Sequence, residues 1–205
     1  MNSKILVSDF DGVIGNSLQI ALTITRKIVD LFDSTESVNT FYDYYRLLGK
    51  KSELNNVTEI ESDTLRELYR IMHRHYSSEI KPFTEVLEVY AKLSHKPMIV
   101  SSSYSDVIKI VVGDYQKNFE SIYGYESGHK KDILQRLKNE NEIIYVTDTF
   151  RDIVICKSIN IPVIATTWGY DPIEKIKAEN PDYIVNNFKE LNELLSELNY
   201  LPTKK

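Results

Sequence analysis

Cysteine is nearly absent from this sequence. The 205 residues include one cysteine, Cys156, so no disulfide can form within the chain. Chains without disulfides are typical of reducing compartments. We therefore expect a cytoplasmic protein, and its hydrophobic content of 42% is sufficient for a core of ordinary size.

Long apolar runs and an excess of positive charge are also missing. No stretch approaches the roughly 18 uninterrupted apolar residues of a membrane-spanning helix, and the first apolar run ends at Asp9, too early for a signal peptide. The 25 basic and 30 acidic residues give a net charge of −5. This charge provides no electrostatic reason to expect nucleic acid or an anionic membrane as a partner. A soluble monomer or homodimer is expected.

Short β-branched and aromatic runs alternate with helical patterns along most of the chain. This alternation predicts a Rossmann-like α/β core with a parallel sheet. Asp171 is expected to cap a helix that has Pro172 in its first turn, and Pro97 follows a helix predicted over 84–93. The predicted strands cover residues 4–9, 98–101, 120–125, 142–148, 161–166 and 182–185.

Residues 16–81 interrupt this alternation. Apolar residues recur there with a helical period in the segments 18–32, 41–48 and 65–80, and Asn16 is expected to be the N-cap of the first helix. The sequence therefore predicts two domains: an α/β core of residues 1–15 and 82–205, and a small all-helical domain of residues 16–81 inserted after the first strand.

Polar side chains stand at the ends of the predicted core strands. Ligands bind beyond the carboxyl ends of the strands in an open parallel sheet, so these residues are candidates for one common site. They are Asp9 and Asp11 after the first strand, Ser101, Ser102 and Ser103 after the second, Asp148 and Asp152 near the end of the strand over 142–148, and Lys130 at a helix start.

The charges of these candidates do not balance. Four carboxylates and one ammonium group leave a charge of −3, and two carboxylates about 4 Å apart repel each other by about 4 kcal/mol at an effective dielectric constant near 20. Mg²⁺ binds beside phosphate through one or two carboxylates, and serine hydroxyls and N–H groups at a helix start bind phosphate. The sequence therefore predicts a site for Mg²⁺ and phosphate at this edge.

The same segments resemble, in order, the four motifs of the haloacid dehalogenase superfamily of phosphatases, in particular its phosphoglycolate phosphatase-like branch. The resemblance covers residues 1–15 and 82–205, and the helical insert is similar to the family's cap in position and size. Asn16 departs from the acid often found there in this branch. Lys131 competes with Lys130 for the third motif, and the register with the following Asp132-Ile133-Leu134 favours Lys130. The matching segments are Asp9-Phe10-Asp11-Gly12-Val13, Ser101, Lys130, 148–152, and 161–170 after the fourth motif.

The resemblance implies a Mg²⁺-dependent phosphatase that hydrolyses a small phosphorylated metabolite, such as a phosphoglycolate-like compound. In this family pattern Asp9 is the nucleophile that forms an aspartyl-phosphate, and Asp11 is the general acid and base. Ser101 or Ser102 and Lys130 then hold the phosphate oxygens.

The metal site is also implied by the resemblance. The expected ligands are drawn from Asp9, Asp11, Asp148 and Asp152. Asp11 contributes its backbone carbonyl, and Asp152 orients metal-bound water or Lys130. A turn at Gly49-Lys50-Lys51 in the cap is the candidate contact to an anionic substrate.

Other functions fit parts of the pattern. A phosphomutase of the same superfamily would return the phosphoryl group to a sugar, and a receiver-type signalling domain would keep a long-lived aspartyl-phosphate. The helical insert and Asp11 argue against the signalling domain, and Asp11 also argues against a dehalogenase, which needs no acid there. A catalytically silent binding subunit is not favoured, because every catalytic position is filled.

Overall fold

The computed structural model describes residues 4–32, 36–48 and 62–202. The chain forms two compact units, one of Met1–Asn16 with Lys81–Lys205 and one of Ser17–Ile80. The turn at Gly49-Lys50-Lys51, a predicted substrate contact, lies outside the described residues.

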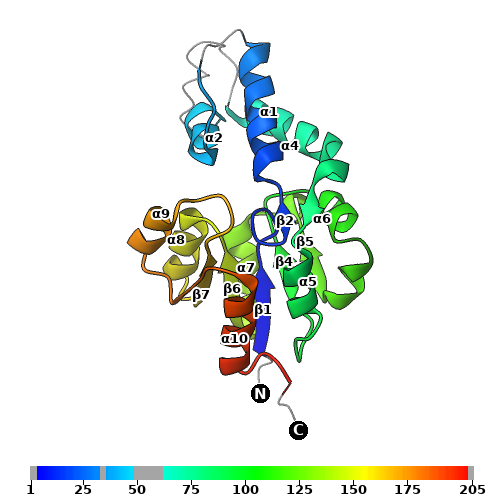
Figure 1. Ribbon diagram of the computed structural model, residues 1–205, viewed down its shortest axis with the longest axis vertical. Coiled ribbons are helices and arrows are strands. Elements are labelled where there is room, and N and C mark those ends of the chain that lie inside the picture. The colour runs from blue at the N-terminus through cyan, green and yellow to red at the C-terminus, as the bar shows by residue number, and fades with distance from the viewer. Residues whose placement is uncertain (1–3, 33–35, 49–61, 203–205) are drawn as a thin grey trace. The chain divides into compact units, whose positions relative to one another are not determined.

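A six-stranded parallel sheet is the centre of the first unit (Figure 1). The predicted Rossmann-like α/β class is therefore confirmed. β1 ends at Ser8 and β6 at Thr147, one residue before the predicted limits, so Asp9 and Asp148 directly follow the last residues of these strands. In spatial order the strands are β5 (Ser121–Tyr123), β4 (Met98–Val100), β1 (Lys4–Ser8), β6 (Glu142–Thr147), β7 (Val163–Thr166) and β8 (Tyr183–Val185).

Helices cover both faces of this sheet, as expected for buried parallel strands. Val7 and Tyr145 belong to a core cluster with residues of α7 and α8 on one face. On the opposite face α5 packs against α10, and the Tyr90 hydroxyl of α5 donates to Ser8 Oγ at 3.0 Å. Figure 1 shows α5 and α10 in front of the strands and α7 behind them. The helices are α5 (Thr84–Tyr90), α6 (Ser105–Val112), α7 (Lys130–Glu140), α8 (Phe150–Ser158), α9 (Ile173–Ala178) and α10 (Phe188–Glu197), with 3₁₀ turns η2 (Gly113–Asn118) and η3 (Tyr125–Ser127).

A short antiparallel ribbon follows the first strand. β2 (Gly15–Asn16) pairs with β3 (Lys81–Pro82), and the N–H groups of Ile14 and Gly15 both donate to the Phe10 carbonyl at 2.8 Å. The sequence predicted Asn16 as the N-cap of α1, and this prediction was wrong because the Asn16 backbone belongs to the ribbon. The N-cap of α1 is Ser17. Strands of two residues have no periodicity for sequence reasoning to detect.

The second unit is entirely helical in its described part. Its helices are α1 (Leu18–Leu31), α2 (Phe41–Leu48) and α4 (Ser62–His75), followed by the 3₁₀ turn η1 (Ser77–Glu79). The helix predicted over 65–80 is thus two elements. The apolar cluster of this unit consists of Leu22, Ile24, Ile28, Val29, Val38, Leu47, Leu48 and Leu65.

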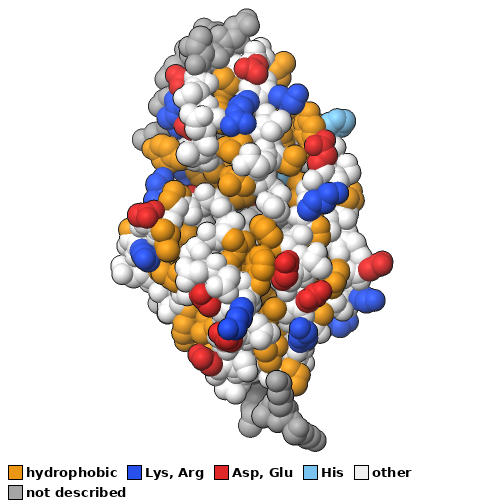
Figure 2. All heavy atoms as spheres, viewed as in Figure 1, with side chains coloured by type: hydrophobic (Ala, Val, Ile, Leu, Met, Phe, Trp, Pro, Cys, Tyr) orange, Lys and Arg blue, Asp and Glu red, His pale blue; other side chains and the backbone are white. Residues whose placement is uncertain are grey.

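Within the described ranges, no helix is both long enough and apolar enough to cross a bilayer. On the face drawn in Figure 2, basic side chains are interspersed with acidic ones.

Candidate active site

The ends of three neighbouring strands bring the predicted residues together. β1 lies between β4 and β6, with Ser8 paired to Ile99 on one side and to Val146 on the other. Asp9, Ser101 and Asp148 therefore follow adjacent strand ends. Lys130 is the first residue of α7, and Asp152 lies in the first turn of α8.

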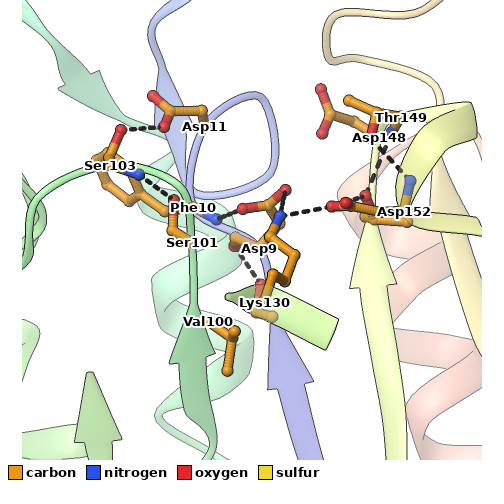
Figure 3. Close-up of polar contacts among 12 residues, drawn as sticks. Asp9, Phe10, Asp11, Val100, Ser101, Ser103, Lys130, Asp148, Thr149 and Asp152 are labelled. Carbon is orange, nitrogen blue, oxygen red and sulfur yellow. Dashed lines mark hydrogen bonds and ion pairs between the residues drawn. The ribbon is translucent and has the colours of Figure 1, made fainter. Parts of the chain in front are cut away.

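Lys130 is held between two carboxylates (Figure 3). Its Nζ lies 2.9 Å from Asp9 Oδ2 and 2.6 Å from Asp152 Oδ2. The three side chains are 11%, 8% and 9% exposed, so water screens these charges little. The ammonium group predicted for this site therefore comes from Lys130, while Lys131 is exposed.

The shared environment moves the three pKa values differently. Burial raises the pKa of Asp9, with Lys130 opposing it and Asp152 adding to it. Burial also acts to raise the pKa of Asp152, but Lys130 and hydrogen bonds outweigh it, so this pKa is lowered. Burial alone would lower the pKa of Lys130, yet the two carboxylates raise it. Lys130 is therefore a firmly charged group at neutral pH.

Two hydroxyl side chains of β6 lie next to Asp152. Thr147 Oγ1 donates to Asp152 Oδ2 at 3.2 Å, and the Tyr145 hydroxyl donates to the Val100 carbonyl at 2.9 Å and lies 3.5 Å from Asp152 Oδ2. Sequence reasoning missed both. Their spacing of two residues on a strand, which places them on one face, was the available indication.

Asp148 is fully buried, and its two carboxylate oxygens differ in their hydrogen bonding. Oδ2 accepts a hydrogen bond from the Tyr170 N–H at 2.7 Å, whereas Oδ1 is buried without a hydrogen-bond partner. Burial raises the pKa of Asp148 to about 8. A Cβ atom at Gly12 or at Gly169 would lie 1.9 Å or 2.2 Å from Oδ2, so both glycine backbones pack against this carboxylate. The sequence did not identify Gly169 or Tyr170 as site residues.

Asp11 and the serines form the other side of the site. Ser103 Oγ donates a hydrogen bond to Asp11 Oδ2, and Figure 3 shows the two side chains turned toward each other. Ser101 is buried, and its Oγ accepts from the Ser103 N–H at 3.1 Å. Ser102, one of the predicted phosphate contacts, is exposed. The contact of Ser103 with Asp11 was not predicted.

Asp171 has a different role from the one expected. The N-cap of α9 is Pro172, and no side chain caps this helix. Asp171 Oδ2 instead accepts from the Phe150 N–H at the start of α8, at 2.9 Å. Asp171 thus provides the hydrogen-bond acceptor for a free N–H group at the N-terminus of α8, and not at that of α9, the helix that follows it in the sequence.

A metal site can be tested against this geometry. In the described part of the chain, no group of three or more Asp, Glu, His or Cys side chains is arranged to hold a metal ion, so the four candidate carboxylates are not gathered into one shell. Asp152 is engaged by Lys130, and Asp11 by Ser103. Lys130 also contacts Asp9, through Oδ2, whereas Asp148 keeps one buried oxygen without a hydrogen-bond partner. Asp148 is close enough to Asp9 to help raise its pKa.

These two carboxylates fit Mg²⁺. Mg²⁺ is commonly held by one or two carboxylates and keeps its other positions for water and phosphate. The buried Oδ1 of Asp148 has a lone pair and no donor to use it. A hard cation is the partner that such an oxygen lacks.

Sequence comparison identifies the family. Residues 6–166 match the model of the haloacid dehalogenase-like hydrolases. The chain therefore belongs to this family of hydrolases, and the resemblance inferred from the four motifs is confirmed.

Individual relatives carry related names. A provisionally named pyrophosphatase, PpaX, from Caldanaerobacter subterraneus subsp. tengcongensis is 26% identical over an alignment of 148 residues, and the match covers 67% of this chain and 67% of that one. A predicted phosphatase from Clostridium acetobutylicum has a similar structure, with a TM-score of 0.77 and 18% identity over 96% of this chain and 99% of that one. A hydrolase from Pseudomonas syringae gives a TM-score of 0.78 at 12% identity, over 96% and 99% of the two chains.

Proposed function

We propose that this hydrolase is a Mg²⁺-dependent phosphatase that acts on a small phosphate monoester through an aspartyl-phosphate at Asp9. The observation that carries the proposal is the buried ammonium group of Lys130 between Asp9 and Asp152, at the strand ends where Asp148 also lies. Family membership and the phosphatase names of relatives support it.

Asp9 is oriented for nucleophilic attack. Its Oδ1 accepts from the Phe10 N–H at 2.8 Å and its Oδ2 accepts from Lys130 at 2.9 Å. One carboxylate oxygen attacks phosphorus, the bond from phosphorus to the leaving oxygen breaks, and Lys130 offsets negative charge on the transferring group.

Asp11 handles the proton in both steps. It first donates a proton to the leaving alcohol oxygen, and then accepts one from the water that attacks the aspartyl-phosphate, which releases inorganic phosphate and restores Asp9. The hydrogen bond from Ser103 holds the Asp11 carboxyl group in place.

The phosphate is bound by groups on both sides of Asp9. Ser101 Oγ accepts from the Ser103 N–H, so its own proton can be donated to a phosphate oxygen. Asp9, Asp148 and the Asp11 backbone carbonyl would hold a Mg²⁺ ion, which would supply positive charge beside the transferring phosphoryl group. The helical unit of residues 17–80 is proposed to act as the cap that selects a small, phosphoglycolate-like substrate.

Asp9→Asn tests the proposal. Phosphate release from a panel of phosphorylated metabolites, assayed with Mg²⁺, should fall on the order of 10³-fold or more, because the amide is a poor nucleophile. Asp114→Asn, at an exposed position in η2, is the matched control and should retain activity. Mass spectrometry of acid-quenched wild-type enzyme should find a phosphoryl group on Asp9. Undiminished turnover by Asp9→Asn would remove the nucleophile assignment.

A further inference from the structure

The segment of residues 167–171, which follows β7, encloses Asp148. The Tyr170 N–H donates to Asp148 Oδ2 at 2.7 Å, and the Asp171 N–H donates to the Asp148 backbone carbonyl at 3.4 Å. The Asp171 side chain accepts from the Phe150 N–H at 2.9 Å, which ties the segment to the start of α8. The segment thus contacts Asp148 through both its side chain and its backbone.

The Gly169 backbone packs directly against the Asp148 side chain. A Cβ atom at this position would lie 2.2 Å from Oδ2, 2.3 Å from Cβ and 2.5 Å from Cγ of Asp148, so only glycine allows this approach. Gly12 approaches the same oxygen, with a Cβ distance of 1.9 Å. Oδ2 is therefore confined between two backbones, and Oδ1 is left buried with no partner.

We propose that the segment 167–171 is a positioning element for Asp148, in which Gly169 and the Tyr170 N–H fix Oδ2 so that Oδ1 is presented to a divalent cation. The inference rests on the proposed function, because the cation is the Mg²⁺ of that reaction. A ligand that is already oriented loses less conformational freedom on binding. A change in the segment should therefore weaken cation binding although the segment supplies no ligand itself.

Direct binding of Mn²⁺ or Mg²⁺ to the full-length protein, without substrate, measures this effect. Electron paramagnetic resonance of free Mn²⁺ and calorimetry with Mg²⁺ are suitable. Gly169→Ala should weaken binding about 10- to 100-fold, the usual size of effects from groups that orient a metal ligand. Gly113→Ala is the control: its φ of +52° makes alanine strained, but a Cβ there meets nothing within 4 Å. This variant loses stability without touching Asp148 and should bind the cation as the wild type does.

A double-mutant cycle separates positioning from general damage. In an Asp148→Gly background both the carboxylate and the Cβ atom that a Gly169 methyl group would meet are gone, so Gly169→Ala should then cost much less stability than it does in the wild type. Equal costs in both backgrounds would place the effect of Gly169 elsewhere and overturn the inference.

A measurement on the wild type does not depend on how the variants fold. The Tyr170 amide should be protected from hydrogen exchange in both metal-free and Mg²⁺-loaded protein, because Oδ2 accepts from it in either state. Rapid exchange in the metal-free protein would show that Asp148 is not oriented beforehand. If the wild type binds neither ion, the metal site and the inference fail together; if it binds and Gly169→Ala binds equally well, only the inference fails.

Discussion

Replacing Asp148 with asparagine is expected to stabilise the metal-free protein. The Asp148 side chain is fully buried, and Oδ1 has no hydrogen-bond partner. An amide carries no charge, and its oxygen can still accept the hydrogen bond that the Tyr170 N–H donates to Oδ2. At a pH above the pKa of Asp148, the substitution therefore removes a buried unpaired charge and keeps the existing contact.

The size of the effect depends on pH. Burial raises the pKa of Asp148 from 3.8 to about 8. Between these values the folded state keeps a proton that the unfolded state releases, so the stability of the wild type falls as the pH rises from about 4 to about 8. At 1.36 kcal/mol per pKa unit the upper limit is about 6 kcal/mol. Loss of an unsatisfied buried group more often gives 1–3 kcal/mol, so we expect about 2–3 kcal/mol at a pH of about 8.5 and almost none near pH 4.

Urea unfolding in the presence of EDTA, repeated across this pH range, measures the difference. A gain of this size corresponds to about 5–10 °C in melting temperature. Added Mg²⁺ should stabilise the wild type, by about 2.7 kcal/mol at 100 times its Kd, but not Asp148→Asn. Asp114→Asn, at an exposed site, should change stability by no more than about 0.5 kcal/mol. An Asp148→Asn protein no more stable than the wild type at high pH would show that the buried carboxylate carries no such cost, and equal stabilisation of both proteins by Mg²⁺ would show that Asp148 does not bind the cation.

Three further substitutions or probes address other parts of the core unit. Lys130→Met should lower the free energy of unfolding in urea by about 3–5 kcal/mol, because two buried carboxylates lose their cation. Lys131→Met, at an exposed position, should lower it by less than about 0.5 kcal/mol. Equal losses in the two variants would contradict the ion-pair assignment. Tyr145→Phe removes the hydroxyl group that joins β6 to the Val100 carbonyl. We expect kcat to fall several-fold with KM nearly constant, and the free energy of unfolding to fall by about 1 kcal/mol. A change in KM alone would indicate a substrate contact instead. Cys156 is buried, and burial raises its pKa, so a disulfide reagent should label it on the order of 10³-fold more slowly in native than in unfolded protein; rapid native labelling would exclude this burial.

The general arrangement of the site follows from the sequence. Asp9, Lys130, Asp148 and Asp152 occupy strand ends or helix starts, and the rule that ligands bind at the carboxyl edge of a parallel sheet is enough to bring them together. The alternation of strands and helices similarly predicted the sheet. These features depend on local pattern and on topology, which a sequence carries.

The detailed contacts could not be predicted in this way. Whether Ser103 or Ser102 faces Asp11 depends on the path of one turn, and the Gly169 contact depends on where a distant loop passes. The predicted helix caps at Asn16 and Asp171 were wrong for two reasons. The Asn16 backbone pairs in the β2–β3 ribbon, and the Asp171 carboxylate accepts a hydrogen bond from the N-terminus of α8. Such competition is decided in three dimensions.

The β2–β3 ribbon also matters for how such a chain could change over time. The polypeptide leaves the sheet-containing unit at Gly15–Asn16 and returns at Lys81–Pro82, and these two places are hydrogen-bonded neighbours. Strands so paired lie about 5 Å apart, so almost any segment whose ends meet could be grafted at this point without stretching the scaffold. The ribbon is therefore a position at which evolution or an engineer can replace the intervening helices with another segment and leave the residues at the strand ends unchanged.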